Sequence, residues 1–347
     1  LYVPTLEPVL PIIGTLGLIL IVMEASLDLK INAEKKKVIQ KSIFSSVVLF
    51  ALFTLIFSYV LNAFYSIPWN TALLNAIPLG IISSAVAIPA AINLKPADKE
   101  FVVYESSFSD ILGILVFDFI IVGFVSVSSG LTSLLLNGFV TLLISILATS
   151  ALAILLHKTT HHVNYVIIMT FIILIYTLAK LIHLPALLFV LIFGLVLANY
   201  RFLDISFIGR FINFEKFGKD IESFKYISGE LTFLVRSFFF IMFGYLTKLD
   251  RLLNIQNLTL SAGIVFFLFL LRWLFFKQVI KEPAVPLLFY APRGLITILL
   301  FLNLPEISRI EIINEGVVTQ VIFVSIILLS IGNMLNKTKA SYPKGIS

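Results

Sequence analysis

The chain has no cysteine, and only 13% of its 347 residues are charged. The absence of cysteine excludes disulfides, thiolate metal sites and cysteine nucleophiles. A soluble domain usually carries about 25% charged residues, so the small charged fraction excludes nucleic-acid binding and a soluble enzyme. No basic segment with a cleavage site precedes the first apolar run, so we expect that the sequence starts inside a longer chain. The chain also lacks a Gly-rich phosphate loop and a nucleophile elbow, so we predict neither enzymatic activity nor a cofactor.

Hydrophobic residues make up 59% of the chain, which includes 33 Phe and has a mean hydropathy of +1.07. A helix that spans a bilayer needs roughly 20 predominantly apolar residues. The predicted fold is therefore an all-α, polytopic membrane protein. The sequence contains eleven such runs, at about 8–29, 39–63, 70–93, 101–126, 131–156, 163–183, 184–200, 226–248, 256–276, 284–304 and 314–335.

The basic residues predict the orientation, because Lys and Arg concentrate in cytoplasmic connections. Of the 25 Lys and Arg residues, 18 lie in one alternate set of connections and the C-terminal tail, and four lie in the other set. We therefore expect the N-terminus outside and the C-terminus in the cytoplasm. Between two runs, Phe214, Phe217, Ile221 and Phe224 recur at helical spacing among charged residues, which predicts an amphipathic helix at the interface over 212–225.

Ionisable residues inside the spans are functional candidates, because a charge at mid-membrane costs at least ~2.5–3.5 kcal/mol on insertion scales. Three acids near run ends (Glu24, Asp28 and Glu230) are as readily explained as interfacial groups. Arg272 lies about one turn from a cytoplasmic end and can reach the interface. The remaining candidates are Glu105, Asp110, Asp118, Arg236 and Arg293.

Glu105 and Asp110 lie on different faces of one predicted helix. Asp110 shares its face with Ser106, four residues earlier, whereas Glu105 is rotated by about 140°. Asp110 and Ser106 can therefore offer oxygen ligands to one hard cation. Glu105 is left to pair with an arginine of another helix. Asp118 either extends a hydrated path or is an acid at a helix end.

Two runs carry proline and small polar residues at mid-membrane, over 77–89 and 286–294. Proline removes a backbone donor and disturbs the preceding turn. Lipid-depth backbone is opened only where it is buried or lines a cavity. Two interrupted helices at matching positions of opposite orientation indicate a secondary-transporter site. The alternative is a pair of proline-kinked helices.

These residues resemble motifs of the monovalent cation:proton antiporters, in the sodium/proton exchanger branch. Glu105 to Asp110 resembles the E-S-x-x-N-D signature, and Phe240 to Gly244 resembles the F-x-x-x-G helix. Pro292 to Leu295 is similar to the R-G helix, and Met23 to Leu29 resembles the F-E-x-G-L segment. The likeness covers about residues 8–335.

The resemblance implies an inverted-repeat fold with two crossed discontinuous helices, in a chain that lacks the first two family helices. It also implies a homodimer in a membrane, for which we expect the bacterial inner membrane. The implied parts are a scaffold helix at 1–38, a first transport repeat at 39–130, a linking helix at 131–162, scaffold helices at 163–250 and a second transport repeat at 251–340.

Asp110 has a largely apolar surround, so we expect it to be shared between a proton and Na⁺ or K⁺. Ser106 and carbonyls near Ser83, Ser84 and Ala85 are expected to be further ion ligands. Glu105 and Arg293 are expected to form a structural salt bridge. The secondary site candidates are Ser109, Asp118, Arg236 and Glu24.

Two departures from the family pattern affect the predicted site. Ser83 and Ser84 stand where relatives often have Thr-Asp, and Ser109 stands where Asn or Asp is usual. One carboxylate fewer favours electroneutral exchange. Two other interpretations stay open, an organic-anion or bile-acid-type symporter with Arg293 as a ligand, and a transport-inactive scaffold or sensor.

Overall fold

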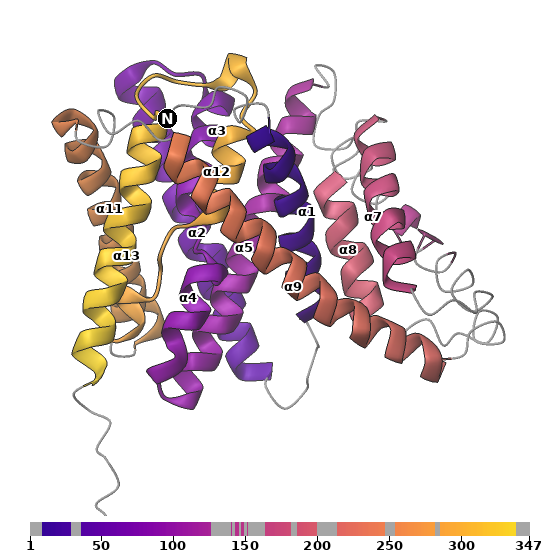
Figure 1. The fold of residues 1–347 in the computed structure, drawn as a ribbon. Coiled ribbons are helices and arrows are strands. Elements are labelled where there is room, and N and C mark those ends of the chain that lie inside the picture. The colour runs from indigo at the N-terminus through magenta and orange to yellow at the C-terminus, as the bar shows by residue number, and fades with distance from the viewer. Residues whose placement is uncertain are drawn as a thin grey trace, which may run out of the picture. The chain divides into compact units, whose positions relative to one another are not determined.

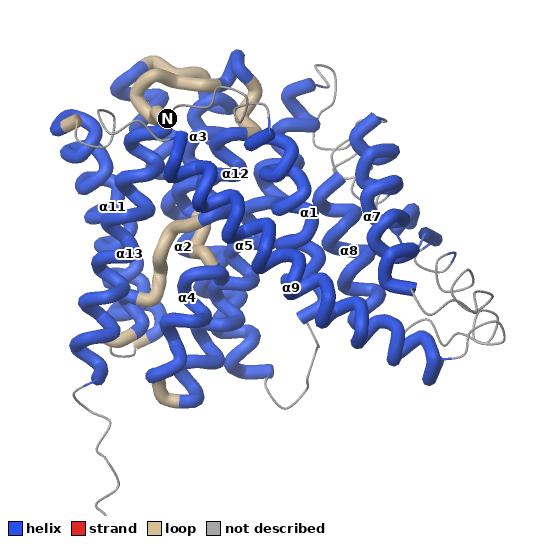
Figure 2. The backbone as a smooth tube through the Cα atoms, viewed as in Figure 1, coloured by secondary structure: helices blue, strands red, loops and turns tan. Residues whose placement is uncertain are grey.

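The computed structural model describes residues 9–28, 36–125, 164–181, 186–199, 214–246, 254–281 and 285–337, together with residues 140, 143–145, 147, 148 and 151. Within these ranges all regular structure is helical (Figure 2). The predicted all-α fold is therefore confirmed. Most of the run expected at 131–156 lies outside the described residues.

The chain divides into two compact units. The first unit comprises Leu1–Asn32 and Ile114–Gly244, and the second comprises Ala33–Gly113 and Tyr245–Ser347. Each unit is thus assembled from two separate stretches of the chain. The scaffold and transport roles expected for these stretches stay predictions.

The first unit contains α1 (Val9–Asp28), α7 (Asn164–Leu181), α8 (Ala186–Ala198) and most of α9 (Phe214–Leu246). α8 packs against both α1 and α7, and its rings at Phe189 and Phe193 stack with centroids 5.7 Å apart. The two apolar runs on either side of His183 to Pro185 are therefore two helices, as predicted.

α9 differs from the prediction, because its 33 residues form one uninterrupted helix. The segment 212–225 was expected to be a separate interfacial helix. Its apolar side chains Phe217, Ile221 and Phe224 are all buried by protein. These side chains continue the helical spacing into the following apolar run, so the backbone has no reason to end between the two segments.

The second unit contains α2 (Lys36–Tyr65), α3 (Trp69–Gly80), α4 (Ser84–Ala90), α11 (Ile255–Phe275), α12 (Leu295–Leu302), α13 (Glu315–Lys337) and the first part of α5 (Pro96–Val125) (Figure 1). α2 packs along α3, α11 packs along α13, and α12 contacts both α3 and α13. Residues 81–83 separate α3 from α4, and the non-helical residues 290–294 precede α12. Both predicted interruptions are therefore confirmed.

Five described helical segments are long and apolar enough to cross a membrane by length and composition. They are Lys37–Tyr65, Trp69–Asn93, Phe217–Tyr245, Ile255–Ile280 and Glu315–Leu335. The segment Trp69–Asn93 contains the break at 81–83, so this crossing is made by two short helices. The described part of the chain adds shorter apolar helices at Ile12–Leu27, Tyr165–Leu181 and Ala186–Ala198.

Candidate ion site at the crossing of two broken helices

Three consecutive backbone amides are released where α3 ends and α4 begins, and each finds a partner elsewhere in the second unit. The N–H of Ile82 donates to Oγ of Ser109 at 2.9 Å, and the N–H of Ser83 donates to the carbonyl of Pro292 at 2.8 Å. The N–H of Ser84 donates to Oδ2 of Asp110 at 3.0 Å. The break is thus held by two side chains of α5 and by the other broken segment.

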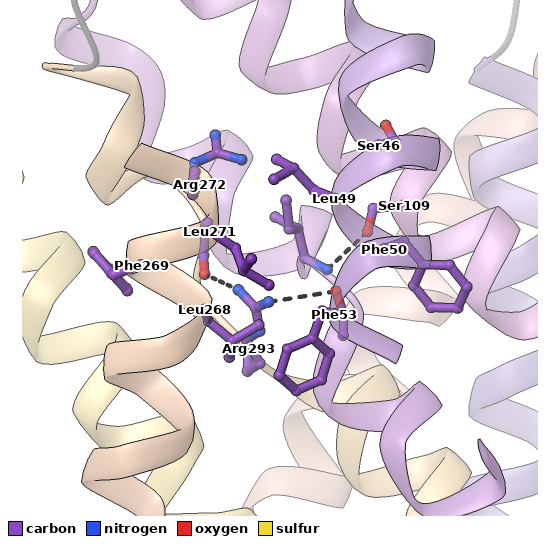
Figure 3. A pocket seen from close by; sticks show the side chains of 13 residues that line it. Ser46, Leu49, Phe50, Phe53, Ser109, Leu268, Phe269, Leu271, Arg272 and Arg293 are labelled. Carbon is purple, nitrogen blue, oxygen red and sulfur yellow. Dashed lines mark hydrogen bonds between the residues drawn. The ribbon is translucent and has the colours of Figure 1, made fainter. Parts of the chain in front are cut away.

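The carbonyls at the C-terminal end of α3 are satisfied by Arg293. Its Nε donates to the carbonyl of Leu79 at 2.9 Å, and its Nη2 donates to that of Gly80 at 3.4 Å. Nη1 donates to the carbonyl of Ala291, in the arginine's own segment. A cation is stabilised at the negative C-terminal end of a helix. Arg293 therefore fastens the second broken segment to the end of the first broken helix (Figure 3).

Close approach at the break depends on two glycines. A Cβ atom on Gly294 would lie 2.5 Å from Oγ of Ser83, and one on Gly113 would lie 2.2 Å from Cδ1 of Ile81. Both distances are shorter than non-bonded carbon contacts allow. A glycine on α12's N-terminal side and another on α5 thus let the two elements touch the residues of the break.

The structure pairs Glu105 with Arg272, so the expected pair of Glu105 with Arg293 is wrong. Nη2 of Arg272 lies 2.6 Å from Oε2 of Glu105, and Nη1 lies 2.8 Å from Oε1. Both side chains are almost fully buried. Arg272 also donates from Nε to the carbonyl of Leu287 at 3.0 Å, and Ser45 Oγ donates to Oε1 of Glu105 at 2.5 Å. The pair thereby joins α2, α5 and α11 to the segment that leads into the second break.

The sequence allows Arg272 to reach the interface, because it lies about one turn before the expected end of its apolar run near residue 276. In the structure, α11 is followed by a π-helical turn over Phe276–Ile280, which carries the helix about one turn further. The guanidinium also lies over the ring of Phe276, 5.0 Å from the centroid. The signal in the sequence for this pair is that Glu105 and Arg272 both lie within apolar runs. Each therefore needs a partner of opposite charge inside the membrane.

The predicted ion ligands come together in part. Asp110, Ser106 and Ser83 are all buried, and Asp110 contacts the backbone of the break through Ser84. The hydroxyl of Ser106 donates to the carbonyl of Val102 on its own helix at 2.7 Å, and its oxygen keeps lone pairs that can accept. In the described part of the chain, Oγ of Ser83 has no hydrogen-bond partner.

The secondary candidates have two different roles. Ser109 lies in the site, where it accepts the hydrogen bond from Ile82. The others lie in the first unit: Oδ2 of Asp118 accepts from the N–H of Leu187 at 3.2 Å, near the start of α8, and Arg236 forms a half-buried ion pair with Glu24 at 3.3 Å. Asp118 lies within α5 and caps the first turn of α8.

Oxygen ligands around a single carboxylate suit a monovalent cation that is carried, whereas a tightly held metal usually needs more ligating side chains. No cluster of three or more His, Cys, Asp or Glu that could hold a metal ion occurs among the residues that the structure describes.

One family model matches nearly the whole chain. The family model described as "Sodium/hydrogen exchanger, transmembrane" matches residues 3–336. The chain belongs to the sodium/hydrogen exchanger family. This family and its fold are those of a transporter, so the chain is an integral membrane protein.

Solved structures support the fold. A structure of the sodium proton antiporter MjNhaP1 from Methanocaldococcus jannaschii at pH 8 is similar with a TM-score of 0.66 and 21% identity, over 93% of this chain and 84% of that chain. An electron-microscopy structure of the same antiporter gives a TM-score of 0.65 and 22% identity, over 95% and 85% of the two chains. The comparison with curated proteins finds no match.

We predict that Arg272→Gln strongly destabilises the protein. The substitution leaves the Glu105 carboxylate buried without its cation, and breaking such a pair from one side costs about 3–5 kcal/mol. Thermal and chemical unfolding in detergent measures this loss. The control is Lys99→Gln on α5, whose side chain is exposed, and its effect should stay within about 0.5 kcal/mol. Equal effects of the two variants would contradict the assigned pair.

We also predict that Gly113→Ala displaces the break. The new methyl group overlaps Ile81, and overpacking of this kind costs about 1–3 kcal/mol. The melting temperature and the maximal transport rate should both fall. Gly263→Ala on α11 is the control, because a Cβ atom there meets nothing within 4 Å. If the two alanine variants behave alike, the close approach of α5 to the break is unimportant.

Proposed function

We propose that this protein exchanges a monovalent cation, Na⁺ or K⁺, for protons, and that both compete for the carboxylate of Asp110. The observation that carries this proposal is the buried position of Asp110 against the opened backbone at Ser84. Secondary transporters place their substrate sites at such interrupted helices. Family membership supports exchange of a cation for protons in general, and the assignment to Asp110 is ours.

The chemistry of a buried carboxylate explains why the exchange is coupled. An ionised carboxylate that leaves water loses several kcal/mol of solvation, so it must be protonated or must hold a cation. The loaded site has the same net charge in either case. Movement of the site across the membrane is therefore favourable only when it carries one of the two ions, and one cation replaces one proton.

Oxygen atoms near Asp110 complete the proposed ion shell. Oγ of Ser83 lies at the same break, and the Ser106 oxygen lies one turn before Asp110. Hard monovalent cations accept hydroxyl and carbonyl ligands of this kind. Oγ of Ser109 accepts the hydrogen bond from the N–H of Ile82. Ser109, which stands where Asn or Asp is usual, therefore holds the break in place. A site with one carboxylate supports electroneutral exchange.

Arg293 helps to choose between transport mechanisms. An organic-anion symporter would use Arg293 as a substrate ligand, whereas here three of its N–H groups go to the carbonyls of Leu79, Gly80 and Ala291. This arrangement supports a role in holding the crossing. We further propose that the first unit is the scaffold of a homodimer in a bacterial inner membrane, with the N-terminus outside.

We expect Asp110→Asn to abolish exchange while the protein still folds, because the amide keeps the shape of the side chain and cannot be ionised. The measurement is cation-dependent release of a pH-dye signal in proteoliposomes, scanned over Na⁺, K⁺ and Li⁺. Asp118→Asn is the control, since an amide oxygen can still cap α8, and it should retain exchange. If Asp110→Asn still exchanges cations for protons, both the proposed site and the proposed mechanism are wrong. The same result would exclude the transport-inactive scaffold.

A further inference from the structure

We propose that the second unit binds a small monovalent anion such as chloride in the cavity beside Arg293. This cavity has a volume of about 20 Å³, which is room for one water-sized molecule or small ion. Its polar lining includes Arg272, Arg293, Ser46 and Ser109, and the rest is mainly Phe and Leu side chains of α2 and α11 (Figure 3). No carboxylate lines it among the described residues.

The two guanidinium groups beside this cavity have more N–H groups than hydrogen bonds. A guanidinium has five N–H groups. Among the described residues, the bonds of Arg293 to Leu79, Gly80 and Ala291 use three of its five, and the bonds of Arg272 to Glu105 and Leu287 use four. The hydroxyl of Ser109 accepts from Ile82, and its proton can be donated in turn. Each guanidinium nitrogen already has one partner, and an anion in the cavity would accept hydrogen bonds from the N–H groups that remain.

The charge of the same cluster also favours an anion. Arg272 and Arg293 contribute two positive charges, and Glu105 contributes one negative charge. Buried charges in proteins are normally compensated. The helix-end carbonyls around Arg293 supply only partial negative charge. When Asp110 is protonated or holds a cation, one positive charge therefore remains in this buried cluster. The edges of phenylalanine rings, such as those of Phe50 and Phe53 in the wall, are weakly positive and tolerate an anion.

An anion in this position would contribute to coupling, a consequence that rests on the proposed function of Asp110. The four charged residues that are buried in the described chain are Glu105, Asp110, Arg272 and Arg293. With a cation or a proton on Asp110, these four groups carry one net positive charge, and a resident anion makes the loaded unit neutral. When Asp110 carries neither a cation nor a proton, the same anion gives the unit one net negative charge. This charge opposes movement of the unloaded site across the membrane.

The direct test is a structure of the full chain with bromide in place of chloride, using the anomalous scattering of bromide. We expect a peak within hydrogen-bonding distance of the Arg293 guanidinium, on the side of Ser109. Bromide peaks elsewhere on the protein with only water in this cavity would overturn the proposal.

Unfolding measurements give a second, independent test. Chloride in place of gluconate, at constant Na⁺, should raise the melting temperature by roughly 2 °C or more, because a ligand that binds only the folded state stabilises it. Leu268→Phe fills the cavity wall and should remove this difference. Leu270→Phe on the same helix is the control, because Leu270 is exposed and does not line the cavity. A chloride effect of equal size in both variants would overturn the proposal.

The two proposals fail separately. If the wild-type protein shows no cation–proton exchange but binds bromide in the cavity, the function proposed for Asp110 is contradicted and the anion site is supported. Normal coupled exchange with a cavity that contains only water, and no effect of chloride on the melting temperature, would overturn the anion site alone.

Discussion

Backbone groups that are opened inside a bilayer must be satisfied by the protein itself, because lipid offers no hydrogen bonds. This constraint determines the arrangement around residues 81–83. The side chain of Arg293 occupies the carbonyl end of α3, and Asp110 occupies the amide end of α4. Each charge lies at the helix end of opposite polarity. The interruption is thereby stable, and it positions a carboxylate where a cation or a proton can neutralise it.

The two buried arginines have separate tasks in this arrangement. Arg293 connects the two broken segments through carbonyl groups, and it makes no ion pair with Glu105. Arg272 forms the buried ion pair with Glu105 and reaches the carbonyl of Leu287, at the start of the second segment. Because Glu105 and Asp110 belong to the same helix, the structural pair and the proposed ion site are held by one rigid element. Substitution of either arginine therefore affects the geometry at Asp110 through a different route.

Much of this organisation was predictable from the sequence. Long apolar runs indicate helices, and the prolines with small polar neighbours located both interruptions within a few residues. The partner of Glu105 was not predictable in the same way, because the sequence shows that a buried acid needs a cation and does not show which helix lies beside it. The turn that extends α11 beyond residue 275 also moved Arg272 away from the helix end. The continuity of α9 was not predicted, because the charged residues at its start suggested a separate helix.

The central claim is that a cation and a proton exclude each other at Asp110, and it is tested most directly by counting protons released when a cation binds. Calorimetric titration of the purified protein with Na⁺ or K⁺, in buffers of different ionisation enthalpy, gives this count without any transport. The account predicts release that approaches one proton per bound cation when the site is initially protonated, and no release from Asp110→Asn. Cation binding of unchanged affinity in that variant, or binding without proton release at every pH, would contradict it.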